Sequence, residues 1–282
     1  MKISIVIPSY NQAKFIERTI NSILLNDCPD IEIIIIDGGS TDNTIDIIKK
    51  YEKDIGYWVS EPDNGQADAL NKGFKIATGE IVGWLNSDDM YCKGTIDDVV
   101  KNFQEDLFCD VVYGGIFIID ENDKITDGYW PTSTNSQYSY NVSLDVHQQG
   151  LFWKRDLFQK TGYLDTELQF IMDYDFIIKV LHYAKINRVK KYYGMFRKHG
   201  DAKTSTISSV GDMEHEIIKE RLKKYTICSS GPYFIFRLRL RLRRLRVIFS
   251  EVGFKYYIFK LGKRFGLQVS QKYLSPVIFS NE

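Results

Sequence analysis

Three short runs of β-branched apolar residues constrain the fold of this 282-residue chain more than any other feature. They cover residues 3–7 (ISIVI), 31–36 (IEIIII) and 81–85 (IVGWL). Strands that are almost continuously apolar are typical of parallel sheets, because both faces of such a sheet are buried. We therefore expect these runs to form strands of a buried parallel sheet.

Helical patterns fill the intervals between the runs. Residues 12–25, 42–51 and 66–77 repeat apolar side chains at helical spacing. Alternating strands and helices predict strand–helix–strand crossovers and a sheet covered by helices on both faces. We expect a short strand at residues 57–60 to join this sheet. The predicted fold class is α/β.

The pattern changes from about residue 108 onward. We expect strands at residues 110–120, 128–131 and 187–197 and helices at residues 168–184 and 213–225. The sequence contains no internal repeat and no low-complexity linker. The chain therefore divides into residues 1–108, residues 109–230 of the same domain, and a tail of residues 231–282.

The formal net charge is zero, with 37 basic and 37 acidic side chains, but these charges are unevenly distributed. Residues 231–282 hold 11 Lys or Arg and 2 Asp or Glu, whereas residues 1–230 hold 26 and 35. A chain with this overall balance is not expected to bind nucleic acid as a whole. The hydrophobic fraction of 44% is that of a globular protein and excludes a disordered chain.

The tail interleaves arginine with leucine, isoleucine and phenylalanine over residues 234–249 (FIFRLRLRLRRLRVIF). Basic amphipathic helices bind anionic membrane surfaces. We expect a basic helical tail that lies on such a surface, with a packing helix or an oligomer contact as the alternatives.

The sequence shows no export signal. The N-terminal apolar stretch is too short for the hydrophobic region of a signal peptide, and no apolar run reaches about 18 residues. The four cysteines are widely spaced without a CxxC pair, so neither a zinc site nor a disulfide framework is indicated. We expect a cytoplasmic protein that its tail places at the inner face of the plasma membrane.

A cluster of polar residues follows each of the three apolar runs. The clusters are residues 8–11 (PSYN), 37–42 (DGGSTD) and 86–89 (NSDD). Ligands of open α/β sheets bind beyond the carboxyl ends of the strands, where these clusters would meet. We interpret Thr41-Asp42 as a helix cap. The adjacent carboxylates of Asp88 and Asp89 repel each other, and a divalent cation such as Mg²⁺ or Mn²⁺ would remove that repulsion.

Common nucleotide and metal motifs are missing from the sequence. The first strand is not followed by GxGxxG, and the chain contains no GxxxxGK[ST], so a dinucleotide site and a P-loop are not indicated. His215-Glu216 begins like the HExxH motif of zinc proteases but lacks the second histidine.

Five segments, in this order, resemble family 2 glycosyltransferases with the GT-A fold. They are residues 5–12 (IVIPSYNQ), 33–44 (IIIIDGGSTDNT), 61–74 (EPDNGQADALNKGF), 77–91 (ATGEIVGWLNSDDMY) and 172–176 (MDYDF). The resemblance implies a Rossmann-like, mostly parallel sheet flanked by helices. It also implies a nucleoside-diphosphate sugar donor, a UDP-sugar above all, and Mn²⁺ or Mg²⁺. Transfer would invert the anomeric carbon, within surface polysaccharide or glycolipid synthesis.

The resemblance also implies roles for residues of the first half, residues 1–108, which would bind the nucleotide sugar. Pro8, Tyr10 and Asp37 would line the base and ribose pocket, and Asp68 would lie near the donor. Asp68 could equally be an exposed carboxylate on its helix.

The family's DxD region matches residues 86–89, with Asn86 where an acid is frequent. We expect Asp89 to be the direct metal ligand and Asp88 to face the ribose or the metal, although Asn86 and Asp88 could equally frame the metal. His199 matches a histidine that reaches the metal or diphosphate, and a neutral imidazole suits Mn²⁺.

The second half, residues 109–230, would bind the acceptor and hold the catalytic base, which matches Asp173. If the helix includes residues 173–184, Asp173 shares a face with Ile177 and Val180, whereas Asp175 points elsewhere. Burial on that face would raise the pKa of Asp173. A plain helix cap is the alternative. His147 and Gln148 match a segment on the acceptor side, which would receive a saccharide or a lipid-linked acceptor.

Two other functions remain open at this stage. A nucleotidyltransferase also uses paired carboxylates, but it needs a basic glycine-rich loop after the first strand, and PSYNQAKF is not one. A non-catalytic nucleotide-sugar-binding protein is compatible with Asn86 and Met172, which stand where the family often has acids.

Overall fold

The computed structural model describes residues 1–132, 146–203 and 208–222, together with residues 225, 242, 245 and 246. Nearly all of the predicted basic tail, residues 231–282, therefore lies outside the described residues.

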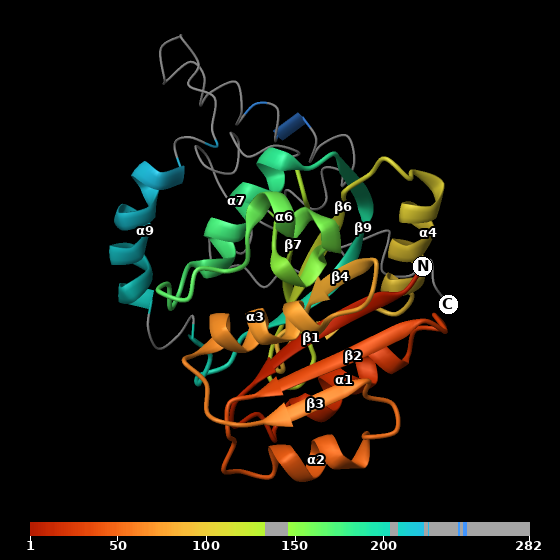
Figure 1. Cartoon of the computed structure of the whole chain (residues 1–282), viewed down its shortest axis with the longest axis vertical. Helices are drawn as coiled ribbons and strands as arrows, with labels where there is room; N and C mark the ends of the chain where they lie inside the picture. Colours follow the sequence, from red (N-terminus) through yellow and green to blue (C-terminus); the bar gives the residue numbers. More distant parts are fainter. Residues whose placement is uncertain (133–145, 204–207, 223–224, 226–241, 243–244, 247–282) are drawn as a thin grey trace.

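A single mixed sheet crosses the molecule (Figure 1). Its order is β3-β2-β1-β4-β8-β6-β9-β5, and β7 pairs with β6. The strands are β1 (Ile3–Ser9), β2 (Ile31–Asp37), β3 (Tyr57–Ser60), β4 (Ile81–Trp84), β5 (Met90–Tyr91), β6 (Val111–Ile119), β7 (Ile125–Tyr129), β8 (Leu151–Lys154) and β9 (Ile186–Arg197).

The three apolar runs form the centre of the parallel part of this sheet. In β1, Ile5 pairs with Ile33 of β2 on one side and with Gly83 of β4 on the other. The predicted strand at residues 57–60 is β3, which extends the parallel part next to β2. Beyond β4 the sheet is mixed, because β8 is antiparallel to both β4 and β6 whereas β9 is parallel to β6.

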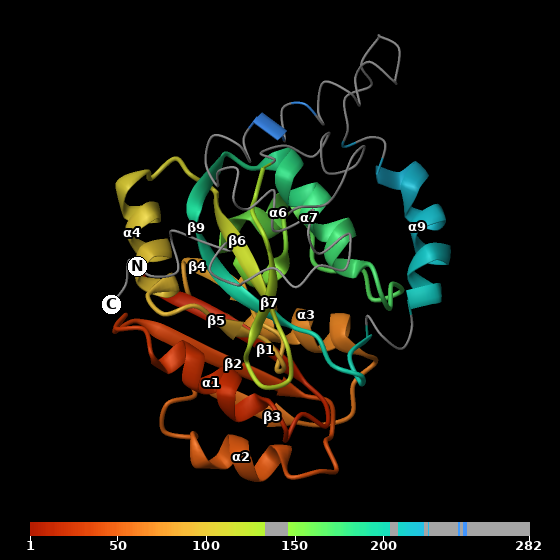
Figure 2. The same ribbon diagram turned by 180° about the vertical axis from the view of Figure 1, so that it is seen from behind.

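Helices cover both faces of the sheet (Figures 1 and 2). On one face lie α1 (Ile16–Leu24), α2 (Thr44–Lys50) and α4 (Thr95–Glu105). On the other face lie α3 (Gln66–Ile76), α6 (Phe158–Thr161), α7 (Met172–Tyr183) and α9 (Ser208–Leu222). Two short 3-10 helices, Gln148–Gly150 and Arg155–Leu157, flank β8.

Two hydrophobic cores result from the alternation of side chains along the strands. Ile33 and Ile35 of β2 pack with α1, α2 and α4, whereas Ile34 and Ile36 pack with α3 and α7. Because successive strand residues point to opposite faces, a run of apolar residues supplies both cores at once.

Gly73 lets α3 approach the sheet closely. A Cβ atom at this position would lie 2.3 Å from Cγ1 of Val6 in β1, which is closer than any side chain allows. The α3 helix begins at Gln66, and its first turn points toward the end of the sheet where the polar clusters gather.

The predicted helices are present with shorter or shifted limits, whereas α4, β5, α6 and the two 3-10 helices were not predicted. The α4 helix (TIDDVVKNFQE) has a β-branched, polar first half, but it buries Ile96, Val99 and Phe103. That apolar face packs against the sheet and stabilises the helix, which its composition alone does not indicate.

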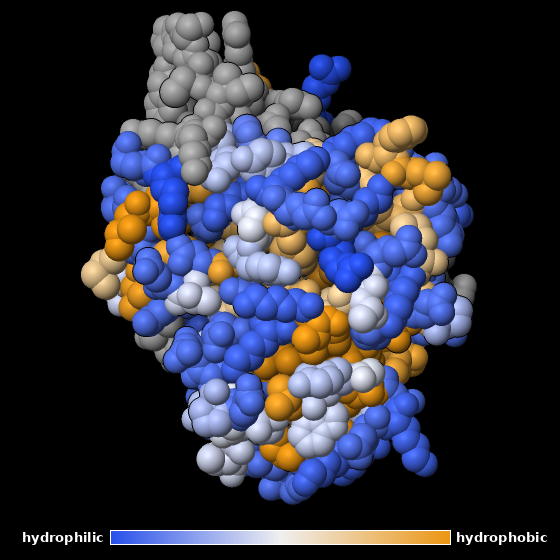
Figure 3. All heavy atoms as spheres, viewed as in Figure 1, coloured by the Kyte–Doolittle hydropathy of each residue, from blue (hydrophilic) through white to orange (hydrophobic). Residues whose placement is uncertain are grey.

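The surface around α3 is largely hydrophilic, with a broad apolar area below this helix over β1 and β2 (Figure 3). Within the described part of the chain, no helix combines the length and the apolar character needed to span a bilayer.

Candidate active site

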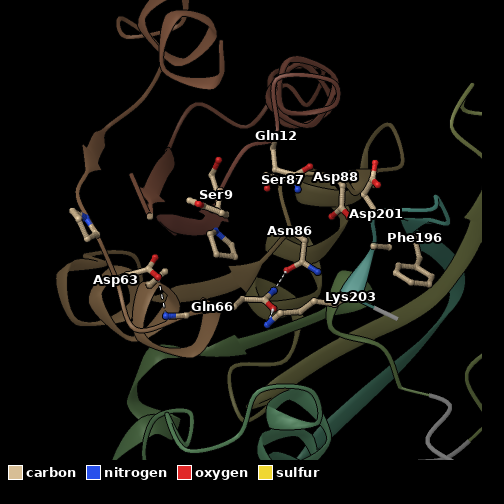
Figure 4. Close-up of a pocket in the computed structure, with 17 residues that line it drawn as sticks. Ser9, Gln12, Asp63, Gln66, Asn86, Ser87, Asp88, Phe196, Asp201 and Lys203 are labelled. Carbon is tan, nitrogen blue, oxygen red and sulfur yellow. Dashed lines mark hydrogen bonds between the residues drawn. The ribbon is translucent and has the colours of Figure 1, made fainter. Parts of the chain in front are cut away.

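A pocket of about 620 Å³ lies at the carboxyl ends of the parallel strands (Figure 4). Its walls come from the ends of β1, β2 and β4, the start of α3, and the end of β9 with the residues that follow. The lining residues are Pro8, Ser9, Tyr10, Gln12, Gly38, Pro62, Asp63, Gly65, Gln66, Ala69, Asn86, Ser87, Asp88, Phe196, Asp201, Ala202 and Lys203. This is the edge at which the polar clusters were predicted to meet.

The loops after β1 and β2 are joined by hydrogen bonds. Asn11 donates its N–H to Ser40 Oγ at 2.7 Å, and its Oδ1 accepts the N–H of Thr41 at 2.8 Å. Asp42 accepts the N–H of Thr44, the first residue of α2, at 3.0 Å. The N-cap position of α2 is Asn43, so the cap predicted at Thr41-Asp42 lies too early in the chain, although Asp42 does accept the first N–H of the helix. The joined loops present Pro8 and Tyr10 to the pocket.

Asp37 lies below the pocket and is fully buried. Its carboxylate accepts the N–H groups of Gly39 and Ser40 at 3.1 and 2.8 Å, and the hydroxyl of Ser60 at 2.7 Å. These bonds hold the end of β2 to the end of β3 and shape the loop that contains Gly38. Asp37 is not among the residues that line the pocket.

Asp88 lines the pocket, and the buried His199, which is not among the lining residues, lies against it. The Nε2 atom of His199 lies 2.9 Å from Oδ2 of Asp88, and the two residues are 111 positions apart in the chain. The ring of Phe15 in the loop before α1 packs against the imidazole, with ring centroids 4.7 Å apart. The pair joins the turn after β4 to the segment after β9.

Asp89 points into the protein and away from the pocket. It is fully buried, and its Oδ1 accepts the N–H of Arg197 at 2.9 Å while its Oδ2 accepts Nε2 of Gln149 at 2.8 Å. Burial, followed by the nearby charge of Asp88, raises the pKa of Asp89 well above its usual range.

Arg197 fixes the end of β9 beside this pair of acids. Its Nε donates to the carbonyl of Asp88 at 2.7 Å, while its own N–H binds Asp89. Since His199 follows two residues later, these bonds determine where its imidazole lies. Asp89 acts on the pocket by holding β9, and Asp88 is the acid that faces the pocket.

Asn86 is bound on two sides through its amide oxygen. Its Oδ1 accepts Nε1 of Trp84 at 2.7 Å. The same oxygen accepts Nε2 of Gln66 at 2.8 Å (Figure 4). The amide oxygen accepts both of these hydrogen bonds without adding a negative charge to the site. Gln66 in turn accepts Nζ of Lys203 at 3.2 Å, so the turn after β4 is connected to the lysine across the pocket.

Asp173 lies in the first turn of α7 and is partly exposed. Burial raises the pKa of its carboxyl and outweighs the N–H of Tyr174 and the positive charge of Lys203, which both lower it. Lys203 lines the pocket, and its charge acts on Asp173, so Asp173 lies within electrostatic range of the pocket.

The prediction that Asp175 points away from the buried side is wrong. Asp175 is fully buried and forms an ion pair with Lys179, and Nε of Arg221 in α9 lies 3.9 Å from its Oδ1. The α7 helix is buried over most of its circumference. The side of α7 on which the sequence places polar residues is covered by α9. Asp175 is therefore more buried than the partly exposed Asp173, so the predicted burial of Asp173 alone is not observed.

The profile of glycosyl transferase family 2 matches residues 4–162, which is more than half of the chain. An uncharacterised glycosyltransferase of Nostoc is 30% identical over 214 residues, which cover 71% of this chain and 66% of the relative. The chain belongs to glycosyl transferase family 2.

Other members of the family are related at a similar level. A PGL/p-HBAD biosynthesis glycosyltransferase of Mycobacterium bovis is 30% identical, over 62% of this chain and 68% of that protein. An uncharacterised glycosyltransferase of Rickettsia conorii is 29% identical over 82% of this chain. The chain spans only 40% of the length of this last relative.

Solved structures of glycosyltransferases share the fold. Staphylococcus aureus TarS residues 1–349 in complex with UDP-GlcNAc match with a TM-score of 0.63 and 22% identity, over 96% of this chain and 77% of that one. The mannosyltransferase PcManGT from Pyrobaculum calidifontis, in complex with GDP-Man and Mn²⁺, matches with a TM-score of 0.58 and 16% identity, over 96% and 81%. At these identities the likeness shows the fold, which is the predicted GT-A type.

Seven residues predicted from the resemblance to family 2 lie outside the pocket lining: Asp37, Asp68, Asp89, His147, Gln148, Asp173 and His199. The base-pocket role of Asp37 and the metal-ligand role of Asp89 stay predictions. Asp68 lies on α3, accepts the N–H of Asn64 at 3.1 Å and has Lys72 within 3.6 Å. Gln148 lies behind Asp89, with its Nε2 3.4 Å from Oδ2 of that residue. His147 packs on the ring of Tyr129, and burial lowers its pKa to about 4, so its imidazole is neutral at pH 7. The donor role of Asp68 and the acceptor roles of His147 and Gln148 stay predictions.

Several pocket residues were not predicted individually. Asp63 and Gln66 lie in the segment 61–74 that resembles family 2, and Asp201 and Lys203 follow His199 closely. Their position in these segments is the only sequence signal that they belong to the site, because isolated polar residues near a helix start are common in any sequence. Their function depends on contacts across the pocket.

A carboxylate that lines the pocket and a histidine beside it are suited to hold a divalent cation. Among the residues that the structure describes, no group of three or more His, Cys, Asp or Glu side chains forms a metal cage. Asp88 and His199 nevertheless supply a carboxylate oxygen and an imidazole nitrogen 2.9 Å apart. Such a donor pair fits Mn²⁺ or Mg²⁺, which bind carboxylates and commonly take further ligands from phosphates and water.

Proposed function

We propose that this member of family 2 is an inverting glycosyltransferase that moves a sugar from a nucleoside-diphosphate sugar to an acceptor hydroxyl. Family membership supports glycosyl transfer, and the pocket of about 620 Å³ lies within the usual size range of small-molecule sites. We favour a UDP-sugar as donor, since the structurally similar TarS was solved with UDP-GlcNAc.

The pair formed by Asp88 and His199 carries this proposal. Asp88 lines the pocket beyond the carboxyl end of β4, where ligands of α/β sheets bind, and His199 lies against Asp88. In our proposal these two side chains hold Mn²⁺ or Mg²⁺. Such an ion, when bound, stabilises the negative charge of a departing nucleoside diphosphate. Pro8 and Tyr10 line the same pocket, and the exposed ring of Tyr10 offers a stacking surface for the base.

Asp173 is the proposed catalytic base. Its raised pKa makes the carboxylate a better proton acceptor than an ordinary exposed aspartate. The carboxylate would take the proton of the acceptor hydroxyl while that oxygen attacks the anomeric carbon on the face opposite the diphosphate. A single displacement of this kind inverts the anomeric configuration.

The acceptor is proposed to be a saccharide or a lipid-linked molecule of surface polysaccharide or glycolipid synthesis. The M. bovis relative is named as a glycosyltransferase of PGL/p-HBAD biosynthesis. The basic tail, residues 231–282, would place the protein at the anionic inner face of the plasma membrane. His147 and Gln148 remain the proposed acceptor-side residues.

A donor screen with product analysis tests the proposed function. Thermal shift with UDP-, GDP- and dTDP-sugars in the presence of Mn²⁺ identifies the donor. A proton NMR spectrum recorded early in the reaction gives the anomeric configuration of the hydrolysis or transfer product. We expect a UDP-sugar to stabilise the protein and the product to be inverted. Donor binding without turnover would support a non-catalytic binding protein, and a retained configuration would contradict the mechanism.

A further inference from the structure

One carboxylate of α9 is buried against the chain just before α7. Glu214 is only 7% exposed. Its Oε1 accepts the N–H of Gln169 at 2.6 Å, and its Oε2 accepts the N–H groups of Phe170 and Ile171 at 2.9 and 3.0 Å. Three consecutive backbone donors thus converge on one side chain that is more than forty positions away in the sequence.

These bonds fix the point at which α7 begins. Ile171 is the residue that precedes the helix, and its own apolar side chain cannot cap the helix. The first N–H groups of a helix have no partner within it, and a negative charge near them is favoured by the helix dipole. Glu214 supplies a charge and two oxygens to the N–H groups of residues 169–171, the last of which is the N-cap position, so α9 holds the segment that leads into α7.

The position of Glu214 is itself fixed by close packing of α9. A Cβ atom at Gly211 would lie 2.3 Å from Cδ1 of Phe170, so only glycine permits this approach. One and two turns beyond Glu214, Ile218 and Leu222 are buried in the same core as Met172. Packing on both sides of Glu214 therefore fixes α9 relative to residues 169–171: Gly211 lies before it in the helix, and Ile218 and Leu222 lie after it.

The segment of residues 169–171 connects Asp173 to the pocket. Asp173 follows Ile171 by two residues. Lys203 lines the pocket and donates its Nζ to the carbonyl of Gln169 at 3.0 Å, and its charge interacts with both Glu214 and Asp173. A shift of the backbone at residues 169–171 would therefore move Asp173 relative to the lysine and to the pocket.

We propose that Glu214 is a positioning residue for the catalytic base. Its carboxylate holds the backbone at residues 169–171 and so sets the place and direction from which Asp173 faces the acceptor. Glu214 does not line the pocket, and its hydrogen bonds act on the start of α7. This inference rests on the proposed role of Asp173.

The substitution Glu214→Gln tests the proposal. It keeps the shape of the side chain but replaces one oxygen with an NH₂ group, which opposes a backbone N–H. We expect kcat to fall roughly 10- to 100-fold, the loss typical of a misplaced reacting group. The Kd of the UDP-sugar should stay within twofold of wild type, because no donor-pocket residue binds Glu214. Asp212→Asn, at an exposed position of the same helix, is the matched control and should leave both values unchanged.

Two further measurements separate positioning from general destabilisation. Amide hydrogen exchange of Glu214→Gln should increase for the peptide that contains residues 169–173 and not for peptides from β1 and β4. In addition, Glu214→Gln should cost less than twofold when it is added to Asp173→Asn, because its effect passes through Asp173. Faster exchange throughout the protein, or an equal loss of donor affinity and kcat, would overturn the proposal.

The outcomes also separate this inference from the proposed function. If Asp173→Asn keeps near-wild-type kcat, the base assignment itself fails. If Asp173→Asn abolishes transfer while Glu214→Gln transfers like wild type, only the positioning role of Glu214 is refuted.

Discussion

Asp88 and Asp89 are adjacent in the sequence but have different environments. Asp88 lines the pocket and contacts His199, whereas Asp89 is buried and holds the end of β9 through Arg197. The sequence predicts that both acids lie at the ligand-binding edge of the sheet. It does not predict which one faces the pocket, because that depends on Arg197 and Gln149, which are far away in the chain.

His199→Ala tests the metal site at the residue scale. Loss of the imidazole should weaken binding of UDP in the presence of Mn²⁺ by about 10- to 100-fold, the range seen when a metal site loses a supporting group. Binding of UDP without metal should stay the same. Isothermal titration with and without Mn²⁺ measures both, and His182→Ala, an exposed histidine of α7, is the control. Equal weakening under both conditions would contradict a metal role.

The elements of the first half were predicted well because each carries its own signal. The strands 3–7, 31–36 and 81–85 are apolar on both faces, and the helices between them repeat buried residues. By contrast, α4 was missed, and β8 could not be paired from the sequence, since its antiparallel position between β4 and β6 depends on the whole sheet. The burial of Asp175 was missed because α9 covers it.

Gly73→Ala tests the close contact between α3 and β1. Alanine normally stabilises a helix interior by about 1 kcal/mol relative to glycine. Here the new methyl group would collide with Val6, so we expect the free energy of unfolding to fall by about 1–3 kcal/mol. Urea denaturation measures the change. Gly200→Ala, where a Cβ atom would meet no atom within 4 Å, is the control. A stabilised Gly73→Ala variant would show that the helix does not pack so closely.

A second element-scale prediction concerns Glu32 at the amino end of β2. It binds Lys2 Nζ at 2.6 Å, Ser4 Oγ at 2.5 Å and the N–H of Thr78 at 2.8 Å. Burial opposes its ionisation, but these hydrogen bonds outweigh burial and lower its pKa to about 2. The group therefore stabilises the fold above its unfolded pKa, and this contribution is lost as the pH falls toward 2.

Glu32→Gln should lower the free energy of unfolding at pH 7 by about 1–2 kcal/mol. The difference from wild type should shrink as the pH is lowered below about 5, because the wild-type carboxylate is protonated in the unfolded chain. Urea denaturation over this pH range measures it, with the exposed Glu52→Gln as control. A penalty that does not change with pH would contradict the predicted charge effect.

At the scale of the whole molecule, the neutral net charge is the sum of two opposite parts. The acidic part, residues 1–230, contains the carboxylates of the pocket and of α7, and the basic part is the tail of residues 231–282. The family and the GT-A fold were predictable because five segments match in order. The geometry of the site was not, because it joins residues from the turn after β4, the end of β9 and α9.

Deletion of residues 231–282 tests the role of the tail. We expect the full chain to float with liposomes that contain anionic lipid and the truncated chain to stay in solution, since about 1 kcal/mol per basic residue near the surface is lost. The effect should decrease with salt. Equal flotation of both forms would contradict the membrane proposal, and a truncated chain with unaltered thermal stability shows that its fold is intact.

The kcat of Asp173→Asn, measured together with the Kd of the donor, tests the central claim most directly. We expect kcat to fall about 10²- to 10⁴-fold, as for loss of a general base, with donor affinity within twofold of wild type. Because burial raises the pKa of Asp173, wild-type kcat/KM should fall as the pH drops through a value above the ordinary aspartate pKa of about 3.9. A variant that transfers sugar at near-wild-type rate, with the same pH profile, would contradict the account.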